Sequence, residues 1–384
     1  MRQRQTDKRS KPLRARFRWM GTSLLVALFT LAALEAALAA AGLFAYYPAH
    51  LPDAEVSLSP WWTCDQAGCH FVHDAARAAC ESGELDGRPC LVNRQGFPDA
   101  DDFDAADSTG SEPRLLILGD SFAFGMKADI GMSFVETLET ALPGSLIWNA
   151  AIPGAGTNQA IATFKVFGSR LRPQITLLAF FTNDFDDNLL PIDSWLNAVG
   201  ADGKAINVRR YLVGEDEKVV ELDLRSIQLM TIFGKEPPEN ELEFRVGSTR
   251  LGAIALRLID SLDSDGTRQE RYDRRQATTR AYLQELRDLV LENDSAFLVM
   301  LIPAPEDISS PGLRYTIAAQ LLSELEIPYL APRGMLDRVA DYAPSPDIHW
   351  SNSGHQKVGV LLSECINAIL KQGSPAGCEH TVLP

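Results

Sequence analysis

The stretch LLILGDSFAFG, residues 115–125, places a serine directly after a run of four apolar residues. Such a run, bounded by turn-forming residues, predicts a buried strand of a parallel sheet. A serine hydroxyl at the end of that strand becomes a nucleophile only if a base removes its proton and donors hold the resulting oxyanion. Gly-Asp-Ser after a strand is also typical of a turn that caps a helix. If Ser121 is catalytic, the rest of the chain must supply the base and the donors.

One of the six histidines lies in a setting that suits a general base. His349 occurs in PDIHWSNSGHQKVG, residues 346–359, just before a stretch with helical spacing. Asp347 precedes it by two residues, and in an irregular loop that spacing lets the carboxylate reach the near imidazole nitrogen. The far nitrogen is then free to accept the proton of Ser121. We expect His355, in the same segment, to cap or pack the first turns of the last helix.

Donors for an oxyanion are expected in the loops after the next two strands. The segment NAAIPGAGTN follows the second predicted strand and offers the backbone N–H of Gly154. The segment FFTNDFDDN follows the third and offers the side-chain amide of Asn183. With the Ser121 N–H these groups form a three-donor hole, in which each donor contributes about 3 kcal/mol of transition-state stabilisation. Singly they are ordinary loop residues, but their placement after successive strands favours a catalytic site.

The segments also match, in order, the four sequence blocks of a known family. GDSF at 119–122, Gly154 in NAAIPGAG, Asn183 in TND and His349 in DIHW resemble the blocks of the SGNH (GDSL-type) hydrolases. The resemblance covers about residues 94–370, and the segment NRQGFPD is similar to a lead-in common in membrane-anchored bacterial members. It implies a flavodoxin-like fold and esterase, lipase, deacetylase or acyltransferase activity.

The resemblance also implies roles for individual residues. Ser121 is the expected nucleophile, His349 the general base and Asp347 its orienting acid. Ser121, Gly154 and Asn183 form the expected oxyanion hole, and the family needs no metal or other cofactor. Many members place the acid three residues before the histidine, where this chain has Pro346.

The two-residue spacing between the acid and the histidine affects which reaction is expected. Asp347 and His349, followed by Trp350, are similar to the D-x-H-W block of polysaccharide O-acetyltransferases in the same superfamily. The leading hypothesis is a serine esterase that acts on acyl esters, including O-acetyl esters, of small molecules or envelope glycans. The alternatives are an acyltransferase with the same triad and a non-catalytic envelope scaffold. The side chains of Phe122, Phe124 and Trp350 either line the pocket or pack its rim.

Strands alternating with helices from residue 113 onward predict a three-layer α/β/α sandwich with a mostly parallel five-stranded sheet. Its site lies at the carboxyl ends of the strands. Residues 191–265 are less regular and are interpreted as an insertion that covers the cleft. Within the insertion, EKVVELDL predicts a short strand and GSTRLGAIALRLIDSL predicts an amphipathic helix. The predicted strands of the sheet lie at 114–120, 145–151, 175–183, 296–304 and 327–332. The predicted helices lie at 132–142, 157–170, 275–293, 311–325 and 352–371.

The N-terminal region predicts a membrane anchor. Residues 1–18 are a basic tail, and residues 19–47 carry one charge and have aromatic residues at both ends. A span of this length crosses a bilayer as a helix, and the basic tail stays in the cytoplasm. The domain from 113 to 384 is then expected in the periplasm, held at the inner membrane. The alternative is a cleaved signal peptide, because ALAAAG offers small residues near a possible cleavage site.

Charge excludes one class of partner. The formal net charge is −15 although the basic tail alone carries eight Lys and Arg residues. The remainder of the chain therefore repels phosphate backbones, and nucleic-acid binding is not expected.

Cysteine usage agrees with export, since all six cysteines follow the predicted anchor. We expect local disulfides that make residues 48–112 a spacer with a cysteine-stapled segment, although other pairings stay open. A zinc site with His70 and His73 is the competitor, but the spacings fit no standard template. The acidic residues of the NDFDD segment are expected to bond loop amides rather than a metal. The local pairs are Cys64–Cys69, Cys80–Cys90 and Cys365–Cys378.

Overall fold

The computed structural model divides the chain into two compact units. One comprises Met1–Asp53 with Gln228–Ser264, and the other Ala54–Ile227 with Asp265–Pro384. The structure describes residues 13–40, 57–58, 62–66, 68–71, 73–82, 89–103, 112–189, 195–199, 205–209, 211–213, 219–221, 249–252, 254, 265–345 and 347–372.

In the first unit the main element is the helix α1, Leu13–Ala40. Glu35 of α1 accepts the backbone N–H groups of Arg250 at 2.8 Å and Leu251 at 3.1 Å. Within the described residues, no helix combines the length and the hydropathy of a membrane span. The predicted amphipathic helix at 247–262 lies largely outside the described residues.

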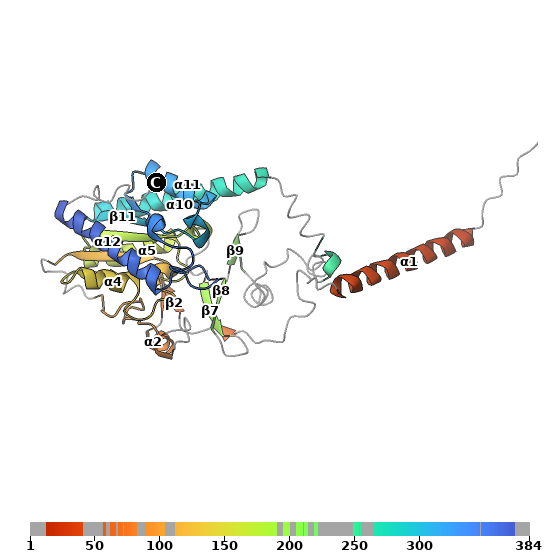
Figure 1. Cartoon of the computed structure of the whole chain (residues 1–384), viewed down its shortest axis with the longest axis horizontal. Helices are drawn as coiled ribbons and strands as arrows, with labels where there is room; N and C mark the ends of the chain where they lie inside the picture. Colours follow the sequence, from red (N-terminus) through yellow and green to blue (C-terminus); the bar gives the residue numbers. More distant parts are fainter. Residues whose placement is uncertain are drawn as a thin grey trace, which may run out of the picture. The chain divides into compact units, whose positions relative to one another are not determined.

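In the second unit a five-stranded parallel sheet carries the core (Figure 1). The spatial order is β12-β11-β6-β4-β5, so β4 lies between β6 and β5. Every pairing in this sheet is parallel, as the alternation of strands and helices predicted. The strands are β4 (Arg114–Gly119), β5 (Leu146–Asn149), β6 (Ile175–Phe180), β11 (Ala296–Leu301) and β12 (Tyr329–Leu330).

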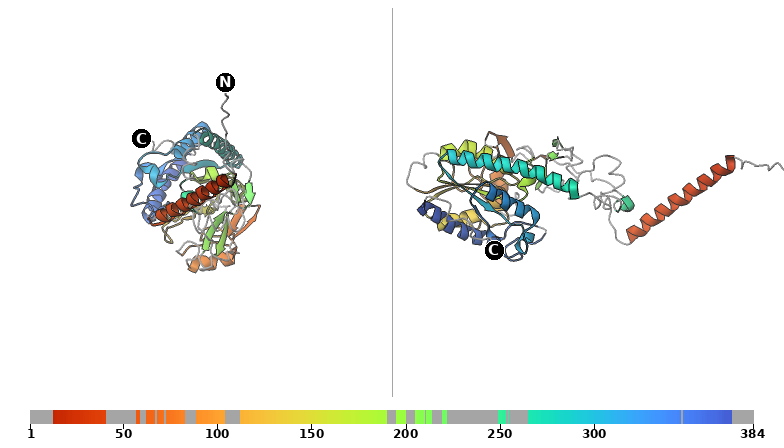
Figure 2. Two further views of the ribbon diagram at one scale, coloured as in Figure 1. Left: turned by 90° about the vertical axis from the view of Figure 1, so that its right-hand side faces the viewer. Right: turned by 90° about the horizontal axis from the view of Figure 1, so that it is seen from above.

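Helices cover both faces of this sheet, which confirms the predicted three-layer α/β sandwich (Figure 2). Side chains of β4 alternate between the layers: Leu115 and Ile117 join one core, and Leu116 and Leu118 join the other. This is why the strand is an unbroken apolar run, since both of its faces are buried. One face packs on α4 (Phe134–Ala141) and α12 (Asn352–Gln372); the other packs on α5 (Thr157–Leu171), α10 (Asp265–Glu292) and α11 (Leu313–Glu324).

Small antiparallel sheets accompany the central one. The strand β1 (Ser57–Leu58) pairs with β7 (Trp195–Val199), and β7 pairs with β8 (Ala205–Arg209). The predicted short strand in EKVVELDL is present as β10. The remaining short elements are β2 (Trp62–Asp65), β3 (Gly68–Phe71), α2 (His73–Ser82), α3 (Ser121–Phe124), α6 (Asp184–Asp187), β9 (Tyr211–Val213), β10 (Val219–Glu221) and the 3-10 helices at Pro305–Ile308 and Pro332–Met335.

Residues 89–103 protect the edge of the central sheet. Asp99 accepts the backbone N–H of Asn149, the last residue of the edge strand β5, at 2.8 Å. Phe97 and Phe103 are fully buried and both lie edge-on to Phe167 of α5. A covered edge has fewer free N–H groups with which another chain could pair.

A disulfide ties the start of the same segment to α2. Cys80 and Cys90 are bonded, with the sulfur atoms 1.98 Å apart, so this predicted pair is present. Cys64 lies opposite Cys69 in the β2–β3 hairpin. Cys365 is also disulfide-bonded, and its expected partner, Cys378, lies outside the described residues.

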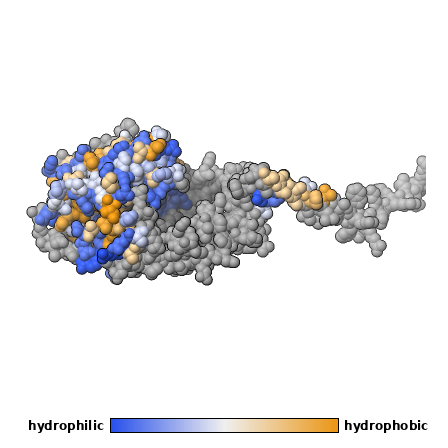
Figure 3. Space-filling view, turned by 60° about the horizontal axis from the view of Figure 1, so that its bottom comes forward, coloured by the Kyte–Doolittle hydropathy of each residue, from blue (hydrophilic) through white to orange (hydrophobic). Residues whose placement is uncertain are grey.

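The described surface mixes polar and apolar residues on the face drawn in Figure 3. In the first unit, α1 exposes large apolar side chains, with Phe29 at 80 % and Val26 at 61 %.

Candidate active site

Ser121 begins the short helix α3 immediately after β4. The Asp120 carboxylate caps this helix by accepting the Phe122 N–H at 3.0 Å. Gly119 has φ +156, and a Cβ there would lie 2.9 Å from both Cβ and the carbonyl oxygen of Ala179 on β6. Only glycine therefore allows β4 to turn this closely against β6, and the turn presents the serine hydroxyl at the end of the sheet.

Ser121, His349 and Asp347 form a continuous hydrogen-bonded chain. The Ser121 Oγ lies 2.7 Å from Nε2 of His349, although 228 residues separate them in sequence. The Nδ1 of His349 lies 2.7 Å from Oδ1 of Asp347, which also accepts the His349 backbone N–H at 3.0 Å. With Nδ1 as the donor toward the carboxylate, Nε2 is left to accept the serine proton.

The charge of Asp347 is favoured by its neighbours. Burial alone would raise its pKa, but the backbone N–H and the ring of His349, together with Lys127, hold the pKa below its usual value. Lys127 reaches it with an Nζ to Oδ2 distance of 3.8 Å. An ionised Asp347 is the form that can orient the imidazole and stabilise its protonated state.

The loop that carries His349 is held by its flanking residues. The His349 carbonyl accepts the Ala343 N–H at 2.8 Å, and Tyr342 and Trp350 form an antiparallel bridge. Tyr342 in turn donates its hydroxyl to the Pro303 carbonyl, just beyond β11, at 2.8 Å. These bonds fix the backbone of the loop to the sheet, and the contact with Asp347 then orients the imidazole ring.

Aromatic packing lies beneath the imidazole. The ring centroid of Phe122 is 5.0 Å from His349 and 5.0 Å from Trp350. Phe122 and Trp350 are fully buried, so both pack below the site rather than line an open pocket. Phe124 is also buried, on the other side of α3.

The serine loop and the histidine loop are bonded to each other. Asp129 donates its N–H to Oδ1 of Asn352 at 2.9 Å and accepts the Asn352 amide at 2.6 Å. His355, in the first turns of α12 as expected, accepts the Phe134 N–H and contacts the Met126 carbonyl, each at 3.3 Å. Burial lowers the pKa of His355 to about 4 and keeps it neutral. The neutral ring can then accept at one nitrogen and donate at the other.

The residues expected to donate to the oxyanion lie in the loops on either side of β4. Gly154 follows β5 with φ +75, and the Ile152 N–H bonds the Gly119 carbonyl at 3.0 Å. Asn183 follows β6, directly before α6. Its amide nitrogen donates to Asp187 at 3.0 Å, while its Oδ1 is buried without a hydrogen-bond partner. The Asp120 carboxyl, directly before Ser121, is a second side-chain hydrogen-bond partner of Asn183, so this residue links α6 to the turn that carries the serine.

The two donor loops are joined by a network that the sequence analysis did not single out. The Thr157 hydroxyl donates to buried Asp184 at 3.0 Å, and the Asn158 N–H donates to Oδ1 of Asn188 at 3.2 Å. Burial, with the nearby charge of Asp120, raises the pKa of Asp184 well above its usual value. Threonine and asparagine at such positions carry no sequence signal, because their partners lie about 30 residues away.

The NDFDD segment was expected to bond loop amides. Asp184 accepts the Thr157 backbone N–H and Asp187 accepts the Asn183 amide, whereas Asp186 pairs with two arginines. Asp186 contacts Arg275 of α10 at 2.6 Å and Arg314 of α11 at 2.8 Å. This double ion pair fixes α6, and with it the backbone next to Asn183. Among the described residues, no group of His, Cys, Asp and Glu has the arrangement of a metal site.

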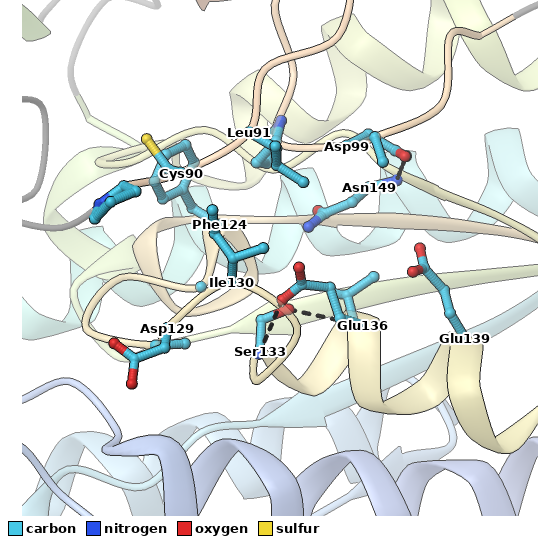
Figure 4. A pocket seen from close by; sticks show the side chains of 16 residues that line it. Cys90, Leu91, Asp99, Phe124, Asp129, Ile130, Ser133, Glu136, Glu139 and Asn149 are labelled. Carbon is cyan, nitrogen blue, oxygen red and sulfur yellow. Dashed lines mark hydrogen bonds between the residues drawn. The ribbon is translucent and has the colours of Figure 1, made fainter. Parts of the chain in front are cut away.

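A pocket of about 90 Å³ lies on the other side of α3 (Figure 4). On one wall Asp99 is joined to the Asn149 N–H, and the Asn149 amide donates to the Ala123 carbonyl at 2.8 Å. This pair supports the helix that begins with Ser121. Burial raises the pKa of Asp99 to about 7 despite the N–H groups of Asn149 and Asp101. Ser121, His349 and Asp347 do not line this pocket.

Comparison with known proteins gave matches among solved structures. No family model matches the chain, and no curated protein matches it. The chain is similar to a lipolytic protein of the G-D-S-L family from Desulfitobacterium hafniense DCB-2, with 11% identity over 66% of this chain and 99% of that one and a TM-score of 0.37. It is also similar to the psychrotrophic esterase EstA from a Pseudoalteromonas species, with 11% identity over 68% and 100% and a TM-score of 0.37.

A third structure is a two-domain esterase active on acetylated mannans, crystallised with mannopentaose. It shares 9% identity over 70% of this chain and 53% of its own length, with a TM-score of 0.37. At these levels of similarity, the function of this chain has to be argued from its own residues.

Proposed function

We propose that this protein is a serine esterase of the SGNH type that cleaves acyl esters through an acyl-enzyme intermediate. The observation that supports it most is the unbroken contact from Ser121 through His349 to Asp347, with both heavy-atom distances at 2.7 Å. A hydroxyl, an imidazole and a carboxylate in this order match the geometry by which a serine is activated.

In the first half of the reaction, His349 accepts the Ser121 proton at Nε2 while Oγ forms a bond to the ester carbonyl carbon. The carbonyl π electrons move to the oxygen, which becomes an oxyanion. When the tetrahedral intermediate collapses, the bond to the alcohol oxygen breaks and His349 returns its proton to that oxygen. Asp347 stabilises the imidazolium that exists between these steps.

In the second half, water replaces the alcohol. His349 removes a proton from the water, whose oxygen attacks the acyl-enzyme carbonyl, and the proton then passes to Ser121 as the acid leaves. The proposed oxyanion donors are the N–H groups of Ser121 and Gly154 and the amide of Asn183. Two observations support this choice of donors. The loops that carry Gly154 and Asn183 follow the strands on either side of β4, and hydrogen bonds join these two loops to each other.

Hydrolysis of a simple ester tests the proposal. Purified protein should release 4-nitrophenol from 4-nitrophenyl acetate, and Ser121→Ala should reduce kcat/KM by at least about 1,000-fold. Ser169→Ala, an exposed serine on α5, is the matched control and should retain the wild-type rate. Equal activity in wild type and Ser121→Ala would contradict a serine esterase.

We also propose that residues 19–47 hold the enzyme at the inner membrane, with the catalytic unit in the periplasm and O-acetyl esters of the envelope as substrates. The composition of that segment supports this, as does the exposure of apolar side chains such as Phe29 and Val26 on α1. Washing membranes with alkaline carbonate tests the anchor. The full chain should stay in the pellet, and its release into the supernatant would argue against the anchor.

A further inference from the structure

The single charge in residues 19–47 is Glu35, and the structure gives it a partner in the insertion. Its carboxylate accepts the backbone N–H groups of Arg250 at 2.8 Å and Leu251 at 3.1 Å, and the Arg250 guanidinium donates to it at 3.3 Å. The stretch Gln228–Ser264 belongs to the same compact unit as α1. Part of the insertion is therefore bonded to the proposed anchor, which a cover for the cleft alone does not require.

The depth of Glu35 along the anchor follows from helix geometry. A hydrocarbon core of about 30 Å takes about 20 helical residues at 1.5 Å each. Tryptophan suits the membrane interface, so a core counted from Trp19 ends near residue 39. Glu35 then lies about one helical turn inside the outer edge, and α1 itself ends at Ala40. Its partners in the insertion must lie at the same depth, at the outer surface of the bilayer.

The backbone of the segment meets the condition that lipid imposes, which is that each N–H finds an acceptor within the protein. The N–H groups of Arg250 and Leu251 donate to Glu35, and the Gly252 N–H donates to the Thr249 hydroxyl at 3.0 Å. The charges of Glu35 and Arg250 also compensate each other, so neither enters the membrane surface without a counter-ion.

Apolar side chains accompany this ion pair on both elements. Leu31 lies four residues before Glu35, on the same face of α1, and is 53 % exposed. On the insertion, Ile254 is 37 % exposed. Exposed leucine and isoleucine beside a compensated ion pair are favoured by acyl chains over water.

We propose that residues 249–252 and Ile254 form a second membrane contact, docked on α1 by Glu35 and Arg250, with Ile254 touching lipid at the outer surface. The inference rests on the proposed anchor and is independent of the proposed chemistry. It makes the insertion the element that joins the chain to the membrane surface at a point away from the anchor's own ends.

A fluorophore at residue 254 tests the lipid contact in the full chain. The chain carrying Ile254→Cys, labelled with the thiol-reactive fluorophore NBD, is placed in phosphatidylcholine nanodiscs with or without doxyl-labelled phosphatidylcholine, which quenches only fluorophores that touch lipid. The doxyl lipid should remove at least about half of the fluorescence.

Glu35→Ala separates docking from anchoring. It removes the acceptor of the segment, so the doxyl lipid should no longer quench the fluorophore at residue 254. It also makes α1 more apolar, so the chain should still stay in the pellet after the carbonate wash. Thr30→Ala, at an exposed site on the same helix, is the matched control and should keep the quenching. Glu35→Ala should hydrolyse 4-nitrophenyl acetate at the wild-type rate, which shows that the variant is folded.

The outcomes distinguish this contact from the anchor. No quenching at residue 254 in the otherwise wild-type chain, or equal quenching in Glu35→Ala, would overturn the second contact while the anchor stands. Release of the full chain by carbonate would overturn the anchor and this inference together, and would leave the esterase function untouched.

Discussion

At the scale of single residues, the proposed chemistry depends on how Asp347 holds His349. The carboxylate oxygen Oδ1 accepts both the ring and the backbone N–H of the histidine, at 2.7 Å and 3.0 Å. Two bonds to one oxygen fix both the loop and the ring. The two-residue spacing is therefore compatible with an orienting acid.

Asp347→Asn is expected to lower kcat by about 10³- to 10⁴-fold, because an amide can favour the wrong imidazole tautomer and cannot stabilise an imidazolium. The measurement is steady-state hydrolysis of 4-nitrophenyl acetate. Asp294→Asn is the control, since Asp294 is exposed at φ +56, a conformation that asparagine tolerates. A loss of less than tenfold in Asp347→Asn would mean that this carboxylate does not orient the base.

The contact of Ser121, His349 and Asp347 could be predicted from sequence because each residue lies in a short motif next to a recognisable strand or helix. Other positions could not. The bond from Asn183 to Asp187 depends on the local shape of α6, and the contact of Lys127 with Asp347 joins loops 220 residues apart. Such contacts arise from tertiary packing and leave no periodic pattern in the chain.

At the scale of elements, the turn from β4 into α3 determines where Ser121 lies. Gly119 is the residue that makes this turn possible, because its missing side chain lets β4 and β6 meet.

Gly119→Ala is expected to lower the free energy of unfolding by about 3 kcal/mol, since it adds overpacking to an unfavourable φ. Gly144→Ala is the matched control: Gly144 also has a positive φ, +83, but a Cβ there meets nothing within 4 Å. Gly144→Ala should lower the free energy of unfolding by only about 1 kcal/mol, because it changes the backbone preference and adds no clash. Urea unfolding measures both, and equal losses would show that the β4–β6 contact is not tight.

The edge of the sheet gives a prediction about pH. Burial raises the pKa of Asp99 to about 7, so the folded state binds its proton more tightly than the unfolded state does. The stability due to this group is complete below about pH 4 and is lost as the pH rises through 7, by about 2 kcal/mol between pH 5 and 7. The acidic residues near Asp99 are Asp101 in its own segment and Asp129, Glu136 and Glu139, which line the same pocket.

Asp99→Asn should remove this part of the pH dependence, because an amide does not titrate in that range. Urea unfolding at pH 5, 6 and 7 should show the wild type losing stability relative to the variant. If the free energy of unfolding changes with pH by the same amount in the wild type and in Asp99→Asn, the pKa of Asp99 is not raised.

Most elements could be predicted from hydrophobic periodicity, but their ends could not. The predicted strands at 145–151, 175–183 and 296–304 each outlast the observed ones, because Ala151, Phe181 and Ile302 are buried beyond the end of the strand. An apolar run reports burial rather than strand pairing. The helices α3 and α6 have four residues each, too few to show a helical period.

At the scale of the molecule, pairings between distant segments complete the second unit. The strand β1 pairs with β7, more than 130 residues later, and the Cys80–Cys90 bond secures the segment that covers the sheet edge. No local pattern predicts the β1–β7 pairing, whereas two cysteines ten residues apart in the sequence suggest the Cys80–Cys90 bond.

The double variant Cys80→Ser/Cys90→Ser is expected to lower the free energy of unfolding by about 3 kcal/mol, the value for a short closed loop. A thermal scan of the two proteins under non-reducing conditions measures this through Tm. Leu291→Ser, an exposed site at the end of α10, controls for a surface substitution. An unchanged Tm in the double variant would mean that this bond does not hold the segment in place.

The central claim is that the imidazole of His349 activates Ser121, and a fluorophosphonate tests it most directly, because it forms a stable bond only with an activated serine. Mass spectrometry of the digested protein should find the adduct on the peptide containing Ser121, no adduct in Ser121→Ala, and labelling at least 100-fold slower in His349→Ala. Failure of Ser121 to react, or equally fast labelling without His349, would contradict the account.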